Sequence, residues 1–263
     1  MSIIENTDHE IVVDLTGLDA EAYRVEIMER LRGVQLDAGM HPEAAAQYCV
    51  MEAVAAVAGE PHSDHPQCVS EVIGAYARRL NDGLPHAERQ ELLRFVPDLV
   101  GTAGDGLDER RYCMLMDWSA RVGVPRLLDA AGFGEHAARL RDLPPVVDAA
   151  GVDAARDALY LVRESTWAAR QRARAELCSR VEAEFGKRGL AAAADVAADV
   201  AADVAAAADV AAAGSFDGVY TAVKAALVER WRRADTPLGT AIRANNRDGI
   251  DLLGRLITAE AAA

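Results

Sequence analysis

The chain has 263 residues, of which 42 are acidic and 28 are basic, so its formal net charge is −14. Apolar residues make up 51% of it and aromatic residues only 5%, a composition typical of a globular chain whose core is built from small side chains. The negative charge argues against a general nucleic-acid-binding protein, because phosphate contacts need clustered Lys and Arg. Alanine has the highest helix propensity, so its abundance predicts helices.

The same totals bear on the compartment. No stretch reaches about 18 uncharged apolar residues, so we expect no membrane-spanning segment. The N-terminus, residues 1–10, is polar and acidic, unlike a secretory signal. Four cysteines in a chain of this length do not form a disulfide framework. We therefore expect a cytoplasmic protein with reduced thiols.

The first half of the chain predicts a compact bundle of short helices. One strand-like run, Ile11–Leu15, precedes it and finds no partner elsewhere in the sequence, so we expect an isolated extended segment. Proline at a first helical position marks two of the helix starts, at Pro42 and Pro66. The expected helices cover residues 18–32, 41–58, 66–81, 87–100, 108–122, 125–131 and 135–141.

The run Leu143-Pro144-Pro145 predicts a boundary between residues 1–143 and residues 144–263. Beyond it we expect long helices over residues 153–184, 190–213, 219–233 and 242–258. The low-complexity helix 190–213 repeats Ala-Asp-Val-Ala, which places an acidic stripe beside a valine stripe. The predicted fold class is therefore all-α, a compact multi-helix bundle followed by long alanine-rich helices.

Two carboxylates stand alone in apolar helices and are candidate catalytic residues. Glu52 is the one charged residue of YCVMEAVAAVA (residues 48–58), and Asp117 lies within YCMLMDW (residues 112–118). A helix that is apolar on every side is normally buried, and a buried carboxylate needs a partner or a raised pKa. The two could form a catalytic pair. Alternatively, each is bonded to an arginine such as Arg78, Arg79 or Arg111.

A loop directly after the first of these helices carries possible metal ligands. His62, His65 and Cys68 have the spacing H-x2-H-x2-C, and imidazole and thiolate are good Zn ligands. Cys49 or Glu52 could complete a tetrahedral zinc site. The alternative is that Asp64 or His65 caps the next helix while Cys68 is a small core residue. The spacing matches no standard zinc-finger template.

Several segments stand out together: residues 49–82, RFVPDLVGT (94–102), residues 112–132, the alanine/aspartate repeat and IDLLGRLI (250–257). In these segments the chain resembles a group of alanine-rich proteins of actinobacteria and their phages, whose members have no assigned activity. The resemblance covers most of the chain. Because the group has no assigned activity, the resemblance implies no catalytic residue.

We therefore keep two functional hypotheses of different classes. The first is a helical scaffold or protein-interaction protein, which would bind a protein partner or form a homo-oligomer through its long helices. The second is a metal-dependent enzyme or metal-binding protein that uses the loop from His62 to Cys68 together with Glu52. The signatures H-E-x-x-H, G-x-x-x-x-G-K-[ST] and G-x-S-x-G are missing from the sequence. A DNA mimic is a third possibility, but four aspartates over about four turns are sparse beside the phosphates of a duplex.

Overall fold

A computed structural model describes residues 4–5, 11–12, 19–43, 47–185 and 237–260. The protein is all-α, and within these described residues its strands are β1 (Ile4–Glu5) and β2 (Ile11–Val12), of two residues each. The strands pair in antiparallel orientation, Ile4 with Val12 and Glu5 with Ile11. The prediction that the strand-like run lacks a partner was therefore wrong, because Ile4 and Glu5 supply one.

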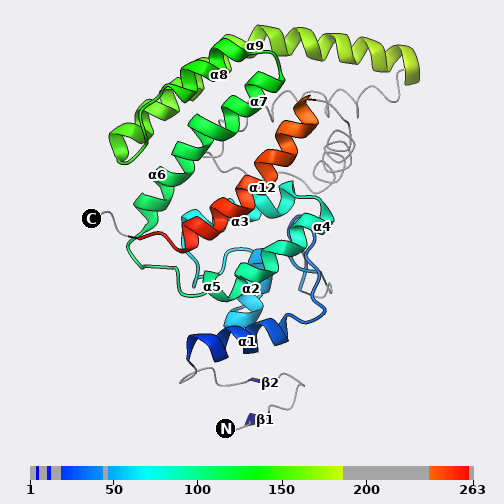
Figure 1. The fold of residues 1–263 in the computed structure, drawn as a ribbon. Coiled ribbons are helices and arrows are strands. Elements are labelled where there is room, and N and C mark those ends of the chain that lie inside the picture. The colour runs from blue at the N-terminus through cyan, green and yellow to red at the C-terminus, as the bar shows by residue number, and fades with distance from the viewer. Residues whose placement is uncertain (1–3, 6–10, 13–18, 44–46, 186–236, 261–263) are drawn as a thin grey trace.

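The described helical elements fall into two groups along the chain (Figure 1). The first group is α1 (Ala20–Arg30), α2 (Val50–Ala58), α3 (Glu71–Gly83), α4 (His86–Arg89), the 3₁₀-helix η1 (Gln90–Phe95) and α5 (Val96–Leu99). The second group is α6 (Asp108–Trp118), the π-helix η2 (Ser119–Gly123), α7 (Val124–Ala130), α8 (Gly134–Arg141), α9 (Ala149–Phe185) and α12 (Pro237–Ile257). The helices predicted over 190–213 and 219–233 lie outside the described residues.

Three helix starts differ from the prediction by five residues or more, and in each case local chemistry explains the shift. Helix α2 begins at Val50 instead of His41, because the Cys49 thiol caps it, the Cys49 backbone is extended and Tyr48 forms a bridge with Leu36. Helix α3 begins at Glu71 instead of Pro66, because the Ser70 side chain accepts the N–H of Ile73 and serves as its N-cap. Helix α12 begins earlier than expected, at Pro237, where proline suits a first helical position.

A first hydrophobic core joins the N-terminal helices to the C-terminal one. Buried side chains of α1, α2, α3, η1 and α5 pack there with Leu115 of α6 and with Ile250, Leu252, Leu253 and Leu256 of α12. Helix α12 lies against α3 and α7, so the last described helix returns to the first part of the chain (Figure 1). The boundary near residue 143 stays a prediction, but this contact crosses it.

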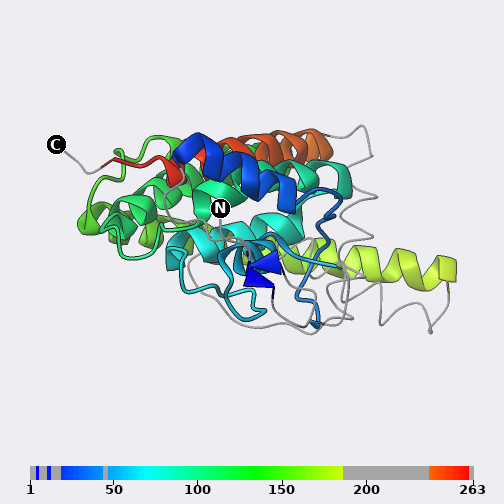
Figure 2. The same ribbon diagram turned by 90° about the horizontal axis from the view of Figure 1, so that it is seen from below.

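A second core lies on the other side of α6. Cys113 and Met116 of α6 pack there with buried residues of η2, α7 and α8 and with Val152, Leu159 and Val162 of α9. Since Leu115 faces the first core, α6 contributes to both cores from opposite faces. Figure 2 shows the same helices in the perpendicular view, with α9 along one edge. The bundle thus depends on the position of α6.

A buried arginine fixes that position. Arg111 of α6 is fully buried, and its Nε donates to the carbonyl oxygen of Leu256 at 3.0 Å. Its Nη1 donates to Oδ1 of Asp105 at 2.7 Å, and Nη2 donates to Oδ2 at 2.5 Å. This bidentate pair lowers the pKa of Asp105 through the hydrogen bonds from Arg111. One guanidinium thereby ties α6 to the preceding loop and to the end of α12.

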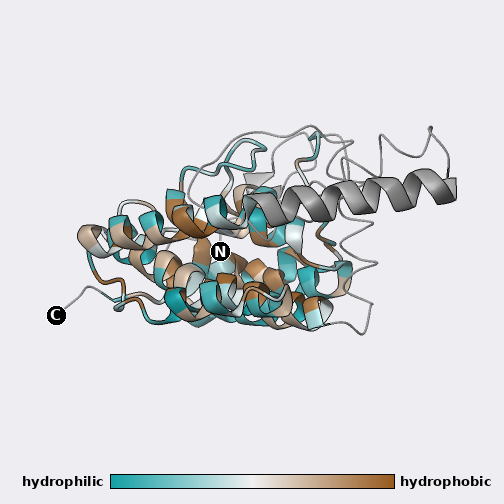
Figure 3. Cartoon of the chain, turned by 90° about the horizontal axis from the view of Figure 1, so that it is seen from above, coloured by the Kyte–Doolittle hydropathy of each residue, from teal (hydrophilic) through white to brown (hydrophobic). Residues whose placement is uncertain are grey.

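Helix α9 is the longest element, with 37 residues. Its N-terminal half packs on α6 and α8 through Val152, Ala155, Leu159 and Val162, which recur at spacings of three and four. Figures 1 and 2 both show its other end extending beyond the rest of the helices. Figure 3 shows hydrophilic (teal) and hydrophobic (brown) residues mixed over the described helices. Within the described residues, no helix combines the length and the apolarity needed to cross a membrane.

The close approach of α12 to α3 predicts a stability effect. A Cβ added at Gly249 would lie 3.1 Å from both Leu80 Cδ1 and Tyr76 Oη, whose hydroxyl donates to the Gly249 carbonyl oxygen at 3.0 Å. We expect Gly249→Ala to lower the free energy of unfolding by about 1–3 kcal/mol, because overpacking forces the two helices apart. Chemical denaturation followed by circular dichroism measures this.

The matched control is Gly83→Ala, since nothing lies within 4 Å of a Cβ added there. That change should stay within about 0.5 kcal/mol of the unsubstituted chain or stabilise it slightly, because it reduces only the entropy of the unfolded chain. Equal stability of the two variants would show that α12 does not pack on α3 as described.

Candidate functional site

The N-terminus of α2 brings together the first candidate residues. Sγ of Cys49 accepts the backbone N–H of Glu52 at 3.4 Å, and the Glu52 carboxylate accepts the N–H of Cys49 at 2.6 Å, which is a capping box. The N–H of Val50 donates to Oδ1 of Asn81 at 3.2 Å, so α3 supplies a third capping group. A carboxylate is favoured at this end of a helix by the helix dipole.

The Glu52 side chain is completely buried and accepts further hydrogen bonds. Oε1 accepts the backbone N–H of His41 at 2.7 Å, and Oε2 lies 2.9 Å from Nδ1 of the same residue. Nε2 of His62 lies 3.6 Å from Oε1. The predicted arginine partner is therefore wrong for Glu52, because two histidines and two backbone N–H groups surround the carboxylate instead.

The two histidines are linked to each other as well as to the carboxylate. Nε2 of His62 lies 2.7 Å from the carbonyl oxygen of His41, so this nitrogen carries the proton and donates it. The His62 ring also lies 6.1 Å from the Tyr48 ring, centroid to centroid. The cluster of Glu52, His41 and His62 thus fastens three segments, the chain before α2, the start of α2 and the loop after it.

The four predicted metal ligands do not converge on one point. His62 donates to His41, whereas Nδ1 of His65 lies 2.7 Å from Oδ1 of Asp64 and the His65 side chain is 65% exposed. Cys68 lies beside Glu60, and the Cys49 thiol caps α2. Among the residues that the structure describes, no group of three or more His, Cys, Asp or Glu side chains has the geometry to hold a metal ion. Each of the four side chains therefore contacts a different neighbour in the fold, and they share no common centre.

The structural alternative for this loop, in which Asp64 or His65 caps the next helix and Cys68 is a core residue, holds only in part. His65 does not cap α3, since Ser70 does. The loop is held instead by Glu60, whose Oε2 and Oε1 accept the backbone N–H groups of Gln67 and Cys68 at 2.6 and 2.8 Å. The thiol of Cys68 is half-buried and packs at the edge of the first core, as the structural alternative expected.

The second candidate carboxylate lies apart from the first. Oδ1 of Asp117 accepts Nη1 of Arg121 at 2.9 Å and the backbone N–H of Val146 at 3.0 Å. An arginine partner was expected, but the one present is on the next turn of the same helical run. Asp117 is one-third exposed and joins α6 to the chain leading into α9. It shares no described bonding partner with Glu52, so the structure does not assemble the predicted catalytic pair.

Sequence reasoning missed His41 and Asn81 as members of this region. The sequence places His41 at a helix start because proline follows it, whereas its backbone N–H donates to Glu52, 11 residues later in the chain. Asn81 was assigned to a helix end, yet it is fully buried. Its Nδ2 donates to the carbonyl oxygen of Asp37 at 2.8 Å. The contacts of His41 with Glu52 and of Asn81 with Asp37 join distant parts of the chain, so no periodic pattern in the sequence predicts them.

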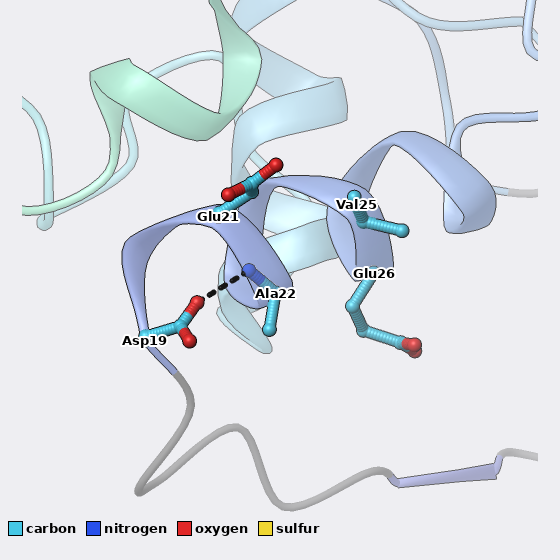
Figure 4. A pocket seen from close by; sticks show the side chains of 5 residues that line it. All are labelled: Asp19, Glu21, Ala22, Val25 and Glu26. Carbon is cyan, nitrogen blue, oxygen red and sulfur yellow. Dashed lines mark hydrogen bonds between the residues drawn. The ribbon is translucent and has the colours of Figure 1, made fainter.

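The surface carries a depression on α1, but its shape offers little for ligand binding. Asp19, Glu21, Ala22, Val25 and Glu26 line it, and all five come from one helix and its N-cap (Figure 4). The Asp19 carboxylate is already used, since it accepts the N–H of Ala22 at 2.8 Å. Without an opposing wall, the depression cannot enclose a small molecule.

A more distinctive surface lies on the outer face of α9. Tyr160, Leu161 and Trp167 are 57%, 67% and 53% exposed, whereas the residues of the same helix that face the second core are buried. Tyr160 and Trp167 are seven residues apart, so they lie on one line along the helix. We call these three side chains the α9 outer patch. Large apolar side chains gathered on one exposed face are typical of interaction sites.

Comparison of the chain with protein-family models, curated proteins and solved structures finds no match. The candidate sites are therefore judged on their geometry.

The Glu52 cluster predicts a large loss of stability on truncation. Glu52→Ala removes the acceptor for the buried N–H groups of His41 and Cys49, so we expect the free energy of unfolding to fall by about 3 kcal/mol or more. Glu52→Gln keeps one acceptor oxygen and should lose less. Hydrogen exchange of the two amides should accelerate in Glu52→Ala. The control Glu29→Ala breaks an exposed pair with Arg32 and should cost less than about 1 kcal/mol.

The thiols predict low reactivity in the folded protein. Burial raises the pKa of Cys49 to about 12 and that of Cys68 to about 11, and Glu60 adds to the effect at Cys68. Only the thiolate reacts, so alkylation by iodoacetamide at pH 8 should be at least about 100-fold slower for these cysteines in the native chain than in denaturant. Peptide mass spectrometry measures each site. A native Cys68 that reacts at the denatured rate would contradict this environment.

Proposed function

We propose that the protein is a non-enzymatic helical interaction module, which binds a protein partner through the α9 outer patch. The observation that carries the proposal is the exposure of Tyr160, Leu161 and Trp167 opposite the buried stripe of the same helix. Aromatic residues on a rigid element are favourable interface anchors, because they bury a large area at little cost in conformational entropy.

The buried charged side chains support the same proposal, because their hydrogen bonds are made within the fold. Glu52 is occupied by backbone N–H groups and histidines, and Arg111 by Asp105 and the carbonyl oxygen of Leu256. A general acid or base needs a side chain that reaches a substrate in an enclosed pocket. The described carboxylates with the strongest claim to such a role stabilise the fold instead. The metal-dependent alternative stays a prediction with less support, because its ligands have separate partners.

A site-specific photo-crosslinker tests the proposal. p-Benzoylphenylalanine at position 161, introduced in the full chain in cells, should yield a discrete cross-linked band of defined mass, because Leu161 is the most exposed side chain of the patch. The same group at Arg139, an exposed position of α8, is the control and should yield none. Tyr160→Ala should weaken the band at position 161.

The outcomes separate clearly. A band at 161 that is lost in Tyr160→Ala supports an interface on the α9 outer patch. Equal labelling from positions 161 and 139 would indicate random collision, and absence of any band at 161 would overturn the proposal.

A further inference from the structure

The outer face of α9 carries a line of exposed side chains that includes both aromatic residues of the outer patch. Successive members are four, three, four and three residues apart, which keeps them on one face of the helix, and they are Asp153, Asp157, Tyr160, Glu164 and Trp167. We call them the α9 outer line. At 1.5 Å per residue the line is about 21 Å long, or about four helical turns. From Asp157 onward, acidic and aromatic side chains alternate along it.

The arginines among the described side chains of α9 lie beside this line instead of on it. At about 100° per residue, the mean direction of Arg156 and Arg163 is about 70° from that of the outer line, toward the buried stripe. The Arg156 guanidinium donates to Oδ1 of Asp153 at 2.9 Å and to the Tyr112 hydroxyl of α6 at 3.2 Å. Positive charge therefore lies along the flank next to the bundle, whereas negative charge faces outward.

Two carboxylates of the outer line decide what can cover it. Among the described ion pairs, the one within α9 joins Arg156 to Asp153, and none involves the exposed residues Asp157 and Glu164. A helix laid along the line would remove both carboxylates from water. Burial of a carboxylate is unfavourable unless a positively charged group bonds it. The aromatic rings favour contact with a helix, and the carboxylates restrict that helix to one with positive charge.

We propose that the partner of the α9 outer patch is a basic amphipathic helix of another protein, which lies along the outer line with an arginine or lysine between Asp157 and Glu164. The inference rests on the proposed function and states the chemistry of the partner. Asp157 and Glu164 lie one turn to either side of Tyr160, so a cation over the Tyr160 ring lies beside both carboxylates. Apolar side chains of the partner pack on Trp167 and Leu161.

Other occupants suit the outer line less well. It carries three acidic side chains and no basic one, so two copies of this line placed against each other bring like charges together. A nucleic acid or an anionic lipid surface is repelled by the same charges. Charge complementarity therefore selects a positively charged helix, and the apolar side chains of the patch require that helix to have an apolar face as well.

The test uses a synthetic helical peptide of about five turns, with leucines on one face and arginines beside them. Fluorescence anisotropy of the labelled peptide measures its binding to the full, untagged chain. A peptide with glutamate in place of arginine should not bind. A peptide of the same composition, shuffled so that no face is apolar, should bind at least about tenfold more weakly. Equal binding of the shuffled peptide would show only attraction to the net charge of −14 and would overturn the inference.

Charge reversal separates the outer line from the rest of the acidic chain. Asp157→Lys and Glu164→Lys should each weaken binding of the arginine peptide at least about tenfold, because repulsion replaces attraction. Glu135→Lys makes the same change of charge at an exposed position of α8 and should alter binding less than about twofold. The double variant of Asp157 and Glu164 should gain affinity for the glutamate peptide, which a damaged fold would not do. Equal weakening by all three single variants overturns the inference.

The photo-crosslinking band at position 161 distinguishes failure of this inference from failure of the proposed function. A band that is lost in Tyr160→Ala but kept in Asp157→Lys and Glu164→Lys supports an interface on the α9 outer patch and overturns the basic partner. A band at twice the chain mass of 28.1 kDa identifies a second copy as the occupant and overturns it as well. If the arginine peptide does not bind and no band forms, both proposals are overturned.

Discussion

The burial of the Arg111 guanidinium is the constraint on which the two cores depend. A charged group removed from water is tolerated only when its donors are bonded, and here Asp105 and the carbonyl oxygen of Leu256 bond them. Because Arg111 lies on α6, the helix shared by both cores, these bonds hold the end of α12 against the helix that also contributes to the second core. The end of α12 is thus held by a residue 145 positions earlier in the chain.

Glu52 follows the same rule at the other end of the first core. Its oxygens accept hydrogen bonds from the backbone N–H groups of His41 and Cys49. Without Glu52 these two buried N–H groups would have no acceptor, so the carboxylate also holds His41 at the start of α2. This explains why an apolar helix carries a single carboxylate. It also explains why the carboxylate, with its lone pairs engaged by the fold, is a poor candidate for catalysis.

The all-α class and the long helix over residues 153–184 follow from alanine content and periodicity, and the structure has both. Helix starts at His41 and Pro66 were wrong, because a proline signal was given more weight than the caps at Cys49 and Ser70. The sequence identified one residue of the candidate site but not its partners. The isolated carboxylate in an apolar run identified Glu52, but its partner His41 is reached through a tertiary contact. Similarly, the H-x2-H-x2-C spacing suggested one metal centre, whereas the loop directs the three side chains to different neighbours.

The contrast between Glu52 and Tyr160 bears directly on function. Glu52 is completely buried and its oxygens accept hydrogen bonds from the protein's own backbone, so a partner cannot contact it. Tyr160, Leu161 and Trp167 are each more than half exposed, on a helix whose opposite face is buried. Burying their apolar area in an interface is favourable by the same hydrophobic effect that builds the cores.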